Sequence, residues 1–461
     1  MACTNVLLIY PDQHRFDCVG VNGHAFVQTP AMDRLAAEGM NFTQAYCPIP
    51  LCVPARNTLL HGQWPVQHHC ICNEGSESPR PPDAGLPTFI EPLRQAGYFM
   101  GCVGKWHVNQ FRGPLEYGFD EYVPEEAYSA WRKEQGLPCH PWSGNWFGEL
   151  DPGIGPEHSR LAWGVDCTLA MLERMAEEQR PFFIRWDPSE PHLPNVVPEP
   201  YFSMYPPETI PPWPSYPDPL VGKPSIQAQQ RLSWQVEDKA WADWATMVSS
   251  YLGTISLLDA QLGRLLDGLQ QLGLAENTLV IYTSDHGDMC GGHGMVDKHN
   301  VMYDDVVRVP MIVRWPGHTQ PGSVCQSFVS NALDLASTFC EVAGVPVPET
   351  FVGQSLAPLL EGAQDNGRQD ILCTYHGNQF GLFSQRMVRD RRWKYVWNPT
   401  AEDELYDTLT DPGELHNLAR DPAHRDELTR MRGRLVAWLE SLRDPLLNNW
   451  TRVQLVQGRR I

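Results

Sequence analysis

The chain has 461 residues, of which 42% are hydrophobic and 20% charged, a composition that is typical of globular proteins and excludes a disordered or fibrous chain. This length exceeds one ordinary hydrophobic core, so we expect two domains or one large domain with an appendage. The net charge of -20 argues against nucleic acids and anionic membranes as partners. A local cluster of basic side chains can still bind an anion, because net charge describes only the surface as a whole.

The thirteen cysteines are an odd number without the spacing of a small disulfide scaffold, which favours free thiols in a reducing compartment. Cys70 and Cys72 are too close together for a zinc knuckle, so we interpret them as structural. The first residues lack the basic and apolar segments of a signal peptide, and no apolar run reaches the roughly 20 residues of a membrane span. We therefore expect a cytoplasmic protein, unless an export signal has been removed.

The first 370 residues predict strands that alternate with helices, the pattern of an α/β domain with a large, mostly parallel sheet flanked by helices. The predicted strands are continuous apolar runs, as expected for strands that are buried on both faces. In chain order, we expect a strand at 6–10, helices at 29–39 and 86–95, a strand at 98–103, a helix at 161–178, a strand at 182–186, a helix at 241–272, and strands at 278–283 and 309–314. Thr29 is expected to cap its helix, with Pro30 at the first position.

Two segments interrupt this alternation. Residues 125–155 and 188–225 are rich in Pro, Trp and Tyr and are too long for simple connections, so we expect them to shape the rim of a site. For each tryptophan, packing remains a simpler explanation than stacking on a sugar.

The last part of the chain has a different pattern. Short strands expected at 371–375, 385–390 and 393–397, followed by a helix at 422–442, predict a small α+β domain with an antiparallel sheet. The predicted domains are therefore residues 1–370 and 371–461. The segment 444–461 is expected to pack either on a neighbouring molecule or on its own core.

Polar side chains follow four of the predicted strands. Asp12 and Gln13 follow the first, Lys105 and His107 the strand at 98–103, His192 the strand at 182–186, and Asp285 and His286 the strand at 278–283. Open α/β sheets bind ligands at the carboxyl ends of their strands, so we expect one site there. Two carboxylates, an amide oxygen and an imidazole are suitable ligands for a divalent cation. Each alone has a simpler explanation, as a strand-end cap or a structural histidine.

Residues 52–56, Cys-Val-Pro-Ala-Arg, fit the pattern C-x-P-x-R. Pro54 predicts the first turn of a helix, which places Cys52 where free backbone N–H groups and the helix dipole favour an anion. A pattern with three fixed positions also recurs by chance, and a lone cysteine is usually a small buried apolar residue.

Together, these motifs resemble those of the type I sulfatases of the alkaline phosphatase superfamily. The resemblance covers nearly the whole chain, including Gly-Lys-Trp-His at 104–107, Ser-Asp-His-Gly-Asp at 284–288 and Lys298. The sulfatase motif that begins at Cys52 continues through Leu60 and Gly62, which match it, whereas His61 replaces the usual Thr and Gln63 the usual basic residue. The resemblance implies that Cys52 is converted to Cα-formylglycine by a maturation enzyme. It further implies a divalent metal bound by Asp12, Gln13, Cys52, Asp285 and His286, contacts to formylglycine from Arg56, Lys105 and His107, and contacts to the sulfate from His192 and Lys298.

Gln13 and His286 depart from the commoner sulfatase pattern and resemble the branch of choline-sulfatases and phosphonate monoester hydrolases. Ca²⁺ is the expected metal, but the imidazole leaves Mn²⁺ and Mg²⁺ as alternatives. In the implied chemistry, a formylglycine hydroxyl attacks sulfur, His192 protonates the leaving oxygen and His107 takes the proton of the second hydroxyl.

The expected function is hydrolysis of a small anionic sulfate ester, either a sulfated carbohydrate or an aryl or alkyl sulfate. The alternative enzyme on the same scaffold is a phosphonate monoester or phosphodiester hydrolase. A binding protein without catalysis would instead keep an unmodified Cys52 and no metal. A homo-oligomer is left open.

Overall fold

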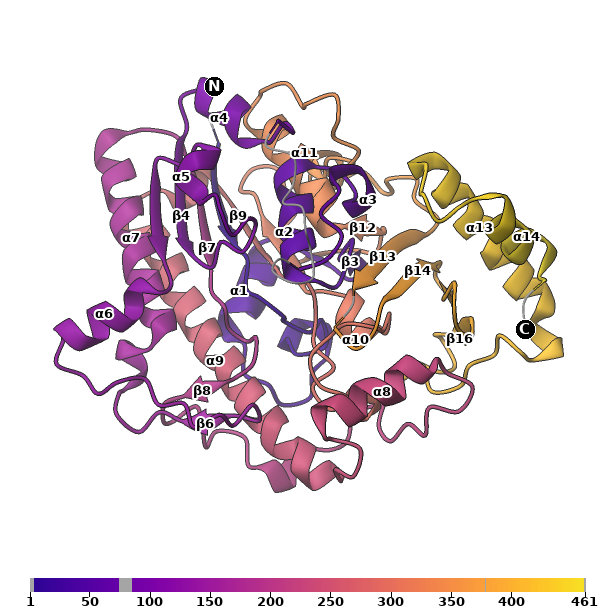
Figure 1. The fold of residues 1–461 in the computed structure, drawn as a ribbon. Coiled ribbons are helices and arrows are strands. Elements are labelled where there is room, and N and C mark those ends of the chain that lie inside the picture. Colours follow the sequence, from indigo (N-terminus) through magenta and orange to yellow (C-terminus); the bar gives the residue numbers. More distant parts are fainter. Residues whose placement is uncertain (1–3, 74–84, 378, 460–461) are drawn as a thin grey trace.

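The computed structural model describes residues 4–73, 85–377 and 379–459, which form a large sheet covered by helices on both faces and a smaller sheet beside it (Figure 1). The large sheet has the strand order β11-β2-β10-β9-β1-β7-β4-β5. Its strands are β1 (Asn5–Ile9), β2 (Met40–Phe42), β4 (Phe99–Gly104), β5 (Glu121–Pro124), β7 (Phe182–Asp187), β9 (Thr278–Thr283), β10 (Met311–Arg314) and β11 (Ser323–Cys325). Strands β9, β1, β7, β4 and β5 run parallel, whereas β10 pairs antiparallel with both of its neighbours. The predicted mixed, mostly parallel sheet is confirmed.

Alternate side chains of β1 enter the two cores of this sheet. Leu7 and Ile9 pack with helices α1 (Pro30–Glu38), α7 (Arg160–Glu178) and α9 (Trp241–Gln271). Val6 and Leu8 point to the other face and pack with α2 (Cys52–His61), α4 (Ile90–Gln95) and α11 (Asn331–Val342). This double burial explains why the strand is a continuous apolar run in the sequence.

The N-terminus of α1 is capped from a distant part of the chain. The hydroxyl of Thr29, the predicted cap, instead accepts a hydrogen bond from the amide of Gly20 at 2.8 Å. The free amides of Ala31 and Met32 donate to the two carboxylate oxygens of Asp259 in α9, at 2.9 and 2.8 Å. Thr29 and Pro30 therefore take the predicted cap and first positions, but the capping side chain is that of Asp259, through which α9 holds α1 in place.

Helix α4 begins at Ile90 rather than at residue 86 as predicted. Leu86 precedes Pro87, and a residue before proline is disfavoured in the α conformation. The hydroxyl of Thr88 accepts a hydrogen bond from the Ile90 amide at 3.2 Å, which satisfies one of the free N–H groups of the first turn.

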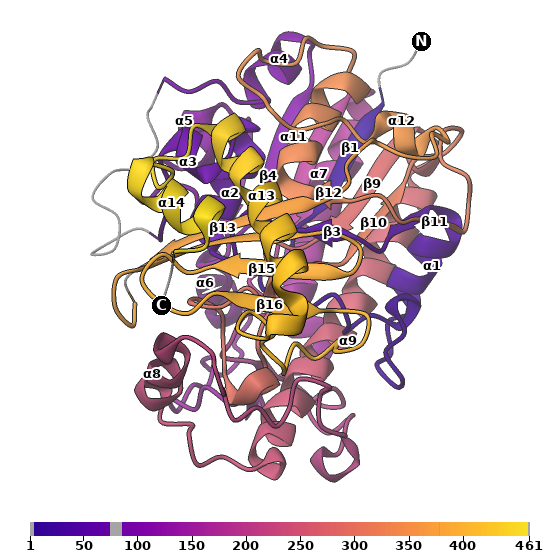
Figure 2. The same ribbon diagram turned by 90° about the vertical axis from the view of Figure 1, so that its right-hand side faces the viewer.

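The C-terminal part forms the predicted antiparallel sheet, covered by a helix that faces the viewer in Figure 2. Its elements are β13 (Ile371–Gly377), β14 (Phe383–Arg389), β15 (Trp393–Trp397), β16 (Glu404–Asp407), α13 (Arg425–Leu442) and α14 (Asn449–Gln457). Helix α14 lies in the segment whose packing the sequence left open. Its Leu455 is buried in one cluster with α13, so this segment packs on its own core.

The smaller sheet is joined to the rest of the chain by hydrogen bonds and an ion pair. The amide and the hydroxyl of Thr374 in β13 both donate to the carbonyl of Pro48, four residues before Cys52, at 2.9 and 3.2 Å. Lys394 in β15 pairs with Asp304 and Glu414, each at 2.6 Å. A domain boundary at residue 370 remains a prediction, because the first core cluster also includes side chains of β13.

The remaining helices and strands are short and connect these layers. They are β3 (Ala45–Tyr46), α3 (Pro65–His68), α5 (Pro114–Tyr117), α6 (Ala127–Glu134), β6 (Glu149–Leu150), β8 (Val196–Val197), α8 (Ser225–Trp234), α10 (Asp304–Val307), β12 (Val329–Ser330) and α12 (Ala357–Leu360). All cysteines in the described ranges are free thiols. No helix in those ranges has both the length and the apolar character needed to cross a lipid bilayer.

Candidate active site

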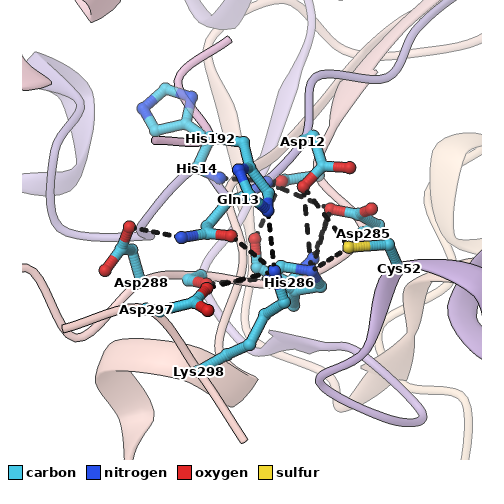
Figure 3. A network of polar contacts seen from close by, with 12 residues as sticks. Asp12, Gln13, His14, Cys52, His192, Asp285, His286, Asp288, Asp297 and Lys298 are labelled. Carbon is cyan, nitrogen blue, oxygen red and sulfur yellow. Dashed lines mark hydrogen bonds and ion pairs between the residues drawn. The ribbon is translucent and has the colours of Figure 1, made fainter. Parts of the chain in front are cut away.

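The predicted polar residues meet because their four strands are neighbours in the sheet. Strands β9, β1, β7 and β4 are adjacent and parallel, so their carboxyl ends lie at one edge. Asp12, Asp285 and His286 are fully buried there, and Cys52, the first residue of α2, joins them with 1% of its surface exposed (Figure 3). One buried polar site therefore forms at this edge.

Four donor atoms converge at the centre of this site. Cys52 Sγ lies 3.2 Å from His286 Nε2 and 3.7 Å from Asp12 Oδ1. His286 Nε2 lies 3.8 Å from an oxygen of each carboxylate, Asp12 Oδ1 and Asp285 Oδ1. These ligand atoms all lie within 4.8 Å of one another. We call Asp12, Cys52, Asp285 and His286 the donor cluster.

The backbone orients the imidazole of His286. Its Nδ1 lies 2.9 Å from the carbonyl oxygen of Gly287 and donates to it, so Nε2 is the nitrogen that faces the centre. Gly287 is required here because a Cβ atom would lie 2.1 Å from the carbonyl oxygen of Asp305. The tight turn after Asp285 thus depends on glycine.

Gln13 is placed by four hydrogen bonds despite a left-handed backbone, with φ of 70°. Its amide donates to Asp285 Oδ1 at 3.1 Å, and its carbonyl oxygen accepts from the hydroxyl of Tyr251 at 2.7 Å. Its side-chain Nε2 donates to Asp288 Oδ2 at 2.5 Å, and its Oε1 accepts from Lys298 Nζ at 2.8 Å. Gln13 therefore adjoins the donor cluster with its oxygen facing the site.

Two cations hold the outer sides of the carboxylates. Arg56 reaches Asp12 Oδ2 at 3.0 Å and Asp285 Oδ2 at 3.2 Å, and Lys105 Nζ reaches Asp12 Oδ2 at 2.8 Å. Burial alone would raise the pKa of Asp12, but Lys105, His192 and Arg56 hold that pKa well below its usual value. Asp12 is therefore ionised and ready to bind a cation.

The electrostatic field at Cys52 favours a negative charge. Burial and the Asp12 carboxylate each raise the pKa of the thiol, but Lys298, Lys105 and His286 outweigh them and hold the pKa well below its usual value. The opening residue of α2 is thus an anion site within an acidic protein.

His192 and Lys298 form a pair beside Gln13. Lys298 Nζ lies 2.9 Å from His192 Nε2, and His192 Nδ1 lies 2.6 Å from the carbonyl oxygen of Leu193. The Nδ1 proton faces that carbonyl, so Nε2 accepts from the ammonium group of Lys298. Asp297 Oδ1 pairs with Lys298 at 3.1 Å and keeps it charged.

His107 is the predicted site residue that the structure does not bring into contact with the others. It has a left-handed backbone, with φ of 44°, and is exposed. Within the described ranges it makes no hydrogen bond or ion pair. Its role towards the hydroxyl of formylglycine remains a prediction.

Sequence reasoning missed Asp288 and Asp297 as parts of the site. Asp288 stands in the Ser-Asp-His-Gly-Asp motif, which was the only available signal, and Asp297 directly precedes Lys298. Asp288 acts on the site through its contact with Gln13, and Asp297 acts through its contact with Lys298.

The donor set fits one divalent cation. It offers two carboxylates and the Nε2 atom of an imidazole, beside an amide oxygen, all buried at one point. Oxygen ligands suit Ca²⁺, Mg²⁺ and Mn²⁺, and the imidazole adds affinity for transition metals.

Comparison with known proteins identifies the family. The model of the sulfatase family matches residues 4–345, and the model described as N-sulphoglucosamine sulphohydrolase, C-terminal, matches residues 291–444. An arylsulfatase of Clostridium perfringens is 28% identical over 95% of this chain and 94% of its own. The choline-sulfatase of Rhizobium meliloti is 26% identical over 91% and 83%. The crystal structure of the phosphonate monoester hydrolase of Agrobacterium radiobacter superposes with a TM-score of 0.82 and 28% identity over 96% of both chains.

These matches confirm the predicted fold and the predicted branch, since choline-sulfatase and phosphonate monoester hydrolase are both among the relatives. The first family model covers well over half of the chain and includes the whole donor cluster. The chain belongs to the sulfatase family.

Proposed function

We propose that this protein hydrolyses a sulfate ester to an alcohol and inorganic sulfate, using formylglycine formed from Cys52 and one divalent cation. The observation that carries the proposal is the position of Cys52. It opens α2 beside two buried carboxylates and an imidazole, while two lysines hold its pKa low. This combination serves a nucleophile that must meet an anionic ester.

The sulfatase family implies two groups, a divalent cation and the hydrate of formylglycine, which would supply the Lewis acid and the nucleophile. A divalent cation supplies Lewis acidity, which lowers the pKa of a hydroxyl group beside it. The hydrate of formylglycine, held at position 52, would supply two hydroxyls on one carbon: one to serve as the nucleophile, and one whose loss of a proton would let sulfate leave as the aldehyde re-forms. A serine has only one hydroxyl and cannot release sulfate in this way.

The residues of the chain bind the sulfuryl group and move protons. Lys105 and Lys298 both place positive charge near Cys52, where negative charge grows on the sulfuryl oxygens. When the bond from sulfur to the leaving oxygen breaks, that oxygen needs a proton. In the pair of Lys298 and His192, the ammonium group would give its proton to His192 Nε2, which passes it to the leaving oxygen, so that Lys298 becomes neutral in this step.

The expected maturation partner must reach Cys52 before the chain folds. In the folded chain the side chain is 1% exposed and lies at the start of a fully buried helix. An enzyme that oxidises this thiol to formylglycine therefore needs an unfolded or partly folded substrate.

Phosphonate monoester hydrolysis is the second candidate. It is favoured by the structural relative of that name, at 28% identity, and by the Gln13 and His286 variant of the site. Both ester classes carry one negative charge at the reacting group, so the ratio of kcat/KM for an aryl sulfate and an aryl phosphonate separates them. A ratio in favour of the sulfate supports the proposal.

The decisive experiment is mass spectrometry of the peptide 48–62 from protein made in a host that forms formylglycine. Conversion of Cys52 lowers the mass by about 18 Da. Cys52→Ala should abolish hydrolysis of an aryl sulfate, whereas Cys139→Ala, at an exposed thiol, should not. An unmodified peptide together with full activity of Cys52→Ala would refute the mechanism. Metal analysis of the same protein distinguishes Ca²⁺ from Mn²⁺ and Mg²⁺.

A further inference from the structure

Three tryptophans form a partly exposed aromatic surface outside the donor cluster. The rings of Trp142 and Trp146 meet edge to face at 5.4 Å, and those of Trp146 and Trp234 at 6.0 Å. Trp142 is 53% exposed and Trp146 40%. We call these three residues the tryptophan wall. Exposing large apolar rings costs free energy, so a contiguous exposed group indicates a binding surface.

The loop that carries two of these rings is held in shape by its own hydrogen bonds. The carboxylate of Glu149 accepts from the amides of Ser143 and Asn145, at 2.9 and 3.1 Å. The side chain of Asn145 donates to the carbonyl of Gly148 at 2.9 Å, and the ring of Phe147 packs against Trp244. The wall is therefore preorganised and loses little conformational entropy on binding a ligand.

One end of the wall is anchored to the segment that carries His192. The amide of Glu149 in β6 donates to the carbonyl of Asn195 at 2.9 Å, just before β8. The buried side chain of Asn195 donates to the carbonyl of Pro191 at 2.9 Å. The loop that carries Trp142 and Trp146 is thus joined through β6, by hydrogen bonds, to the segment that carries His192.

The other end is anchored to Lys298. Gln230, fully buried in α8, donates from Nε2 to the carbonyl of Lys298 at 2.7 Å. Trp234 lies one helical turn farther along α8, about 5.4 Å away. Trp234 also packs on the cluster that includes Leu193 and Val296, neighbours of the two sulfate-binding candidates.

The two segments that meet at His192 and Lys298 therefore meet again at Trp146 and Trp234. Figure 1 shows α8 and the paired strands β6 and β8 on the same side of the molecule, below the helix α2 that begins at Cys52. The wall is linked to the site through the segments that carry His192 and Lys298, and none of its residues belongs to the donor cluster.

We propose that the tryptophan wall binds a neutral pyranose ring of a sulfated oligosaccharide, beyond the ring that carries the ester. The apolar face of a pyranose stacks on indole rings, and its hydroxyls remain free for polar partners. We expect a small aryl sulfate to occupy the donor cluster alone. The loop 139–149 contains one Glu and no Lys or Arg, which favours an uncharged ring. This inference rests on the proposed sulfatase function.

The test compares two substrates in wild type, Trp142→Ala and Trp146→Ala. The probes are monosulfated lactose or N-acetyllactosamine, whose second ring is neutral, and 4-nitrophenyl sulfate. We expect kcat/KM for the disaccharides to fall about tenfold or more through KM, and that for the aryl sulfate to stay within about twofold. Trp146→Phe should restore part of the loss. Trp450→Ala, at an 83% exposed tryptophan on α14, is the matched control and should change neither.

A binding experiment separates this proposal from the catalytic one. Calorimetry with Cys52→Ala protein should show binding of the monosulfated disaccharides that the added Trp146→Ala change weakens about tenfold. The proposed role of the wall is overturned if disaccharide binding or turnover is unchanged in both tryptophan variants. It is also overturned if wild type neither binds nor hydrolyses the disaccharides. Equal losses for both substrates would show a structural role and also overturn it. Failure of wild type on the aryl sulfate and the disaccharides alike, with intact disaccharide binding, refutes the catalytic proposal alone.

Discussion

Asp288 Oδ2 accepts a hydrogen bond from Gln13 Nε2 at 2.5 Å, and this contact determines which end of the Gln13 amide faces the site. Asp288 Oδ1 accepts from the amide of Cys290 at 2.7 Å, so the carboxylate has two donors to satisfy. The Gln13 oxygen is consequently left for Lys298 and for a bound cation. Asp288 thus acts on the site through Gln13.

Replacing Asp288 with Asn tests this orientation. An asparagine side chain has only one oxygen, so it cannot accept from both Gln13 and Cys290, and the Gln13 amide becomes free to turn. We expect metal affinity to fall by about 10- to 100-fold, measured by titration of chelator-treated protein with Ca²⁺ and Mn²⁺. Asp267→Asn, in a surface ion pair, is the control. Unchanged affinity in Asp288→Asn would show that Asp288 does not position Gln13.

Arg56 is expected to support folding as well as the site. Its guanidinium lies fully buried between Asp12 and Asp285, so Arg56→Ala leaves two buried carboxylates without that partner. We expect the free energy of unfolding in chelator to fall by about 3 to 5 kcal/mol, measured with denaturant. Arg34→Ala, which removes exposed ion pairs, should cost less than about 1 kcal/mol. Equal effects of the two changes would contradict the expected role.

Stability should depend on pH through Asp259, which lies away from the donor cluster. Burial raises its pKa to about 7, although the amides of Ala31 and Met32 lower it. An unfolded aspartate has a pKa of about 3.9, so between about pH 4 and pH 7 the folded state binds the proton more tightly. Stability from this group therefore falls as pH rises through that window, by up to about 1.4 kcal/mol per pH unit.

Asp259→Asn should remove this pH dependence, because asparagine does not titrate. The measurement is the unfolding free energy of wild type and variant at several values between about pH 5 and pH 8. We expect wild type to lose stability relative to the variant as pH rises. Parallel curves would show that Asp259 titrates in the usual acidic range.

Lys298 should contribute chiefly to the transition state. We expect Lys298→Ala to lower kcat/KM for an aryl sulfate by about 10² to 10³, because a fixed positive charge beside the sulfuryl oxygens is lost. Lys133→Ala, at an exposed lysine, is the control. A loss in KM alone, with kcat retained, would place Lys298 in ground-state binding instead.

The donor cluster could be predicted from sequence because apolar runs mark the buried strands. Parallel strands that are neighbours in a sheet have their carboxyl ends at the same edge, so the polar residues after them meet. The cap of α1 could not be predicted, because Asp259 lies 228 residues from Ala31 and local rules favour Thr29. The orientation of Gln13 is likewise set by Asp288, 275 residues away. Helix α14 did have a local signal, since the side chain of Asn448 caps it and Thr451 completes a capping box.

The contact between Thr374 and Pro48 also affects the order of events during synthesis. It fixes the segment before Cys52 against β13, whose Thr374 lies 326 residues after Pro48. At usual rates of translation, the ribosome needs roughly 15 to 65 s to add that length. The thiol therefore emerges long before its final brace exists, and the nascent chain has an interval in which this cysteine is still open to a modifying enzyme.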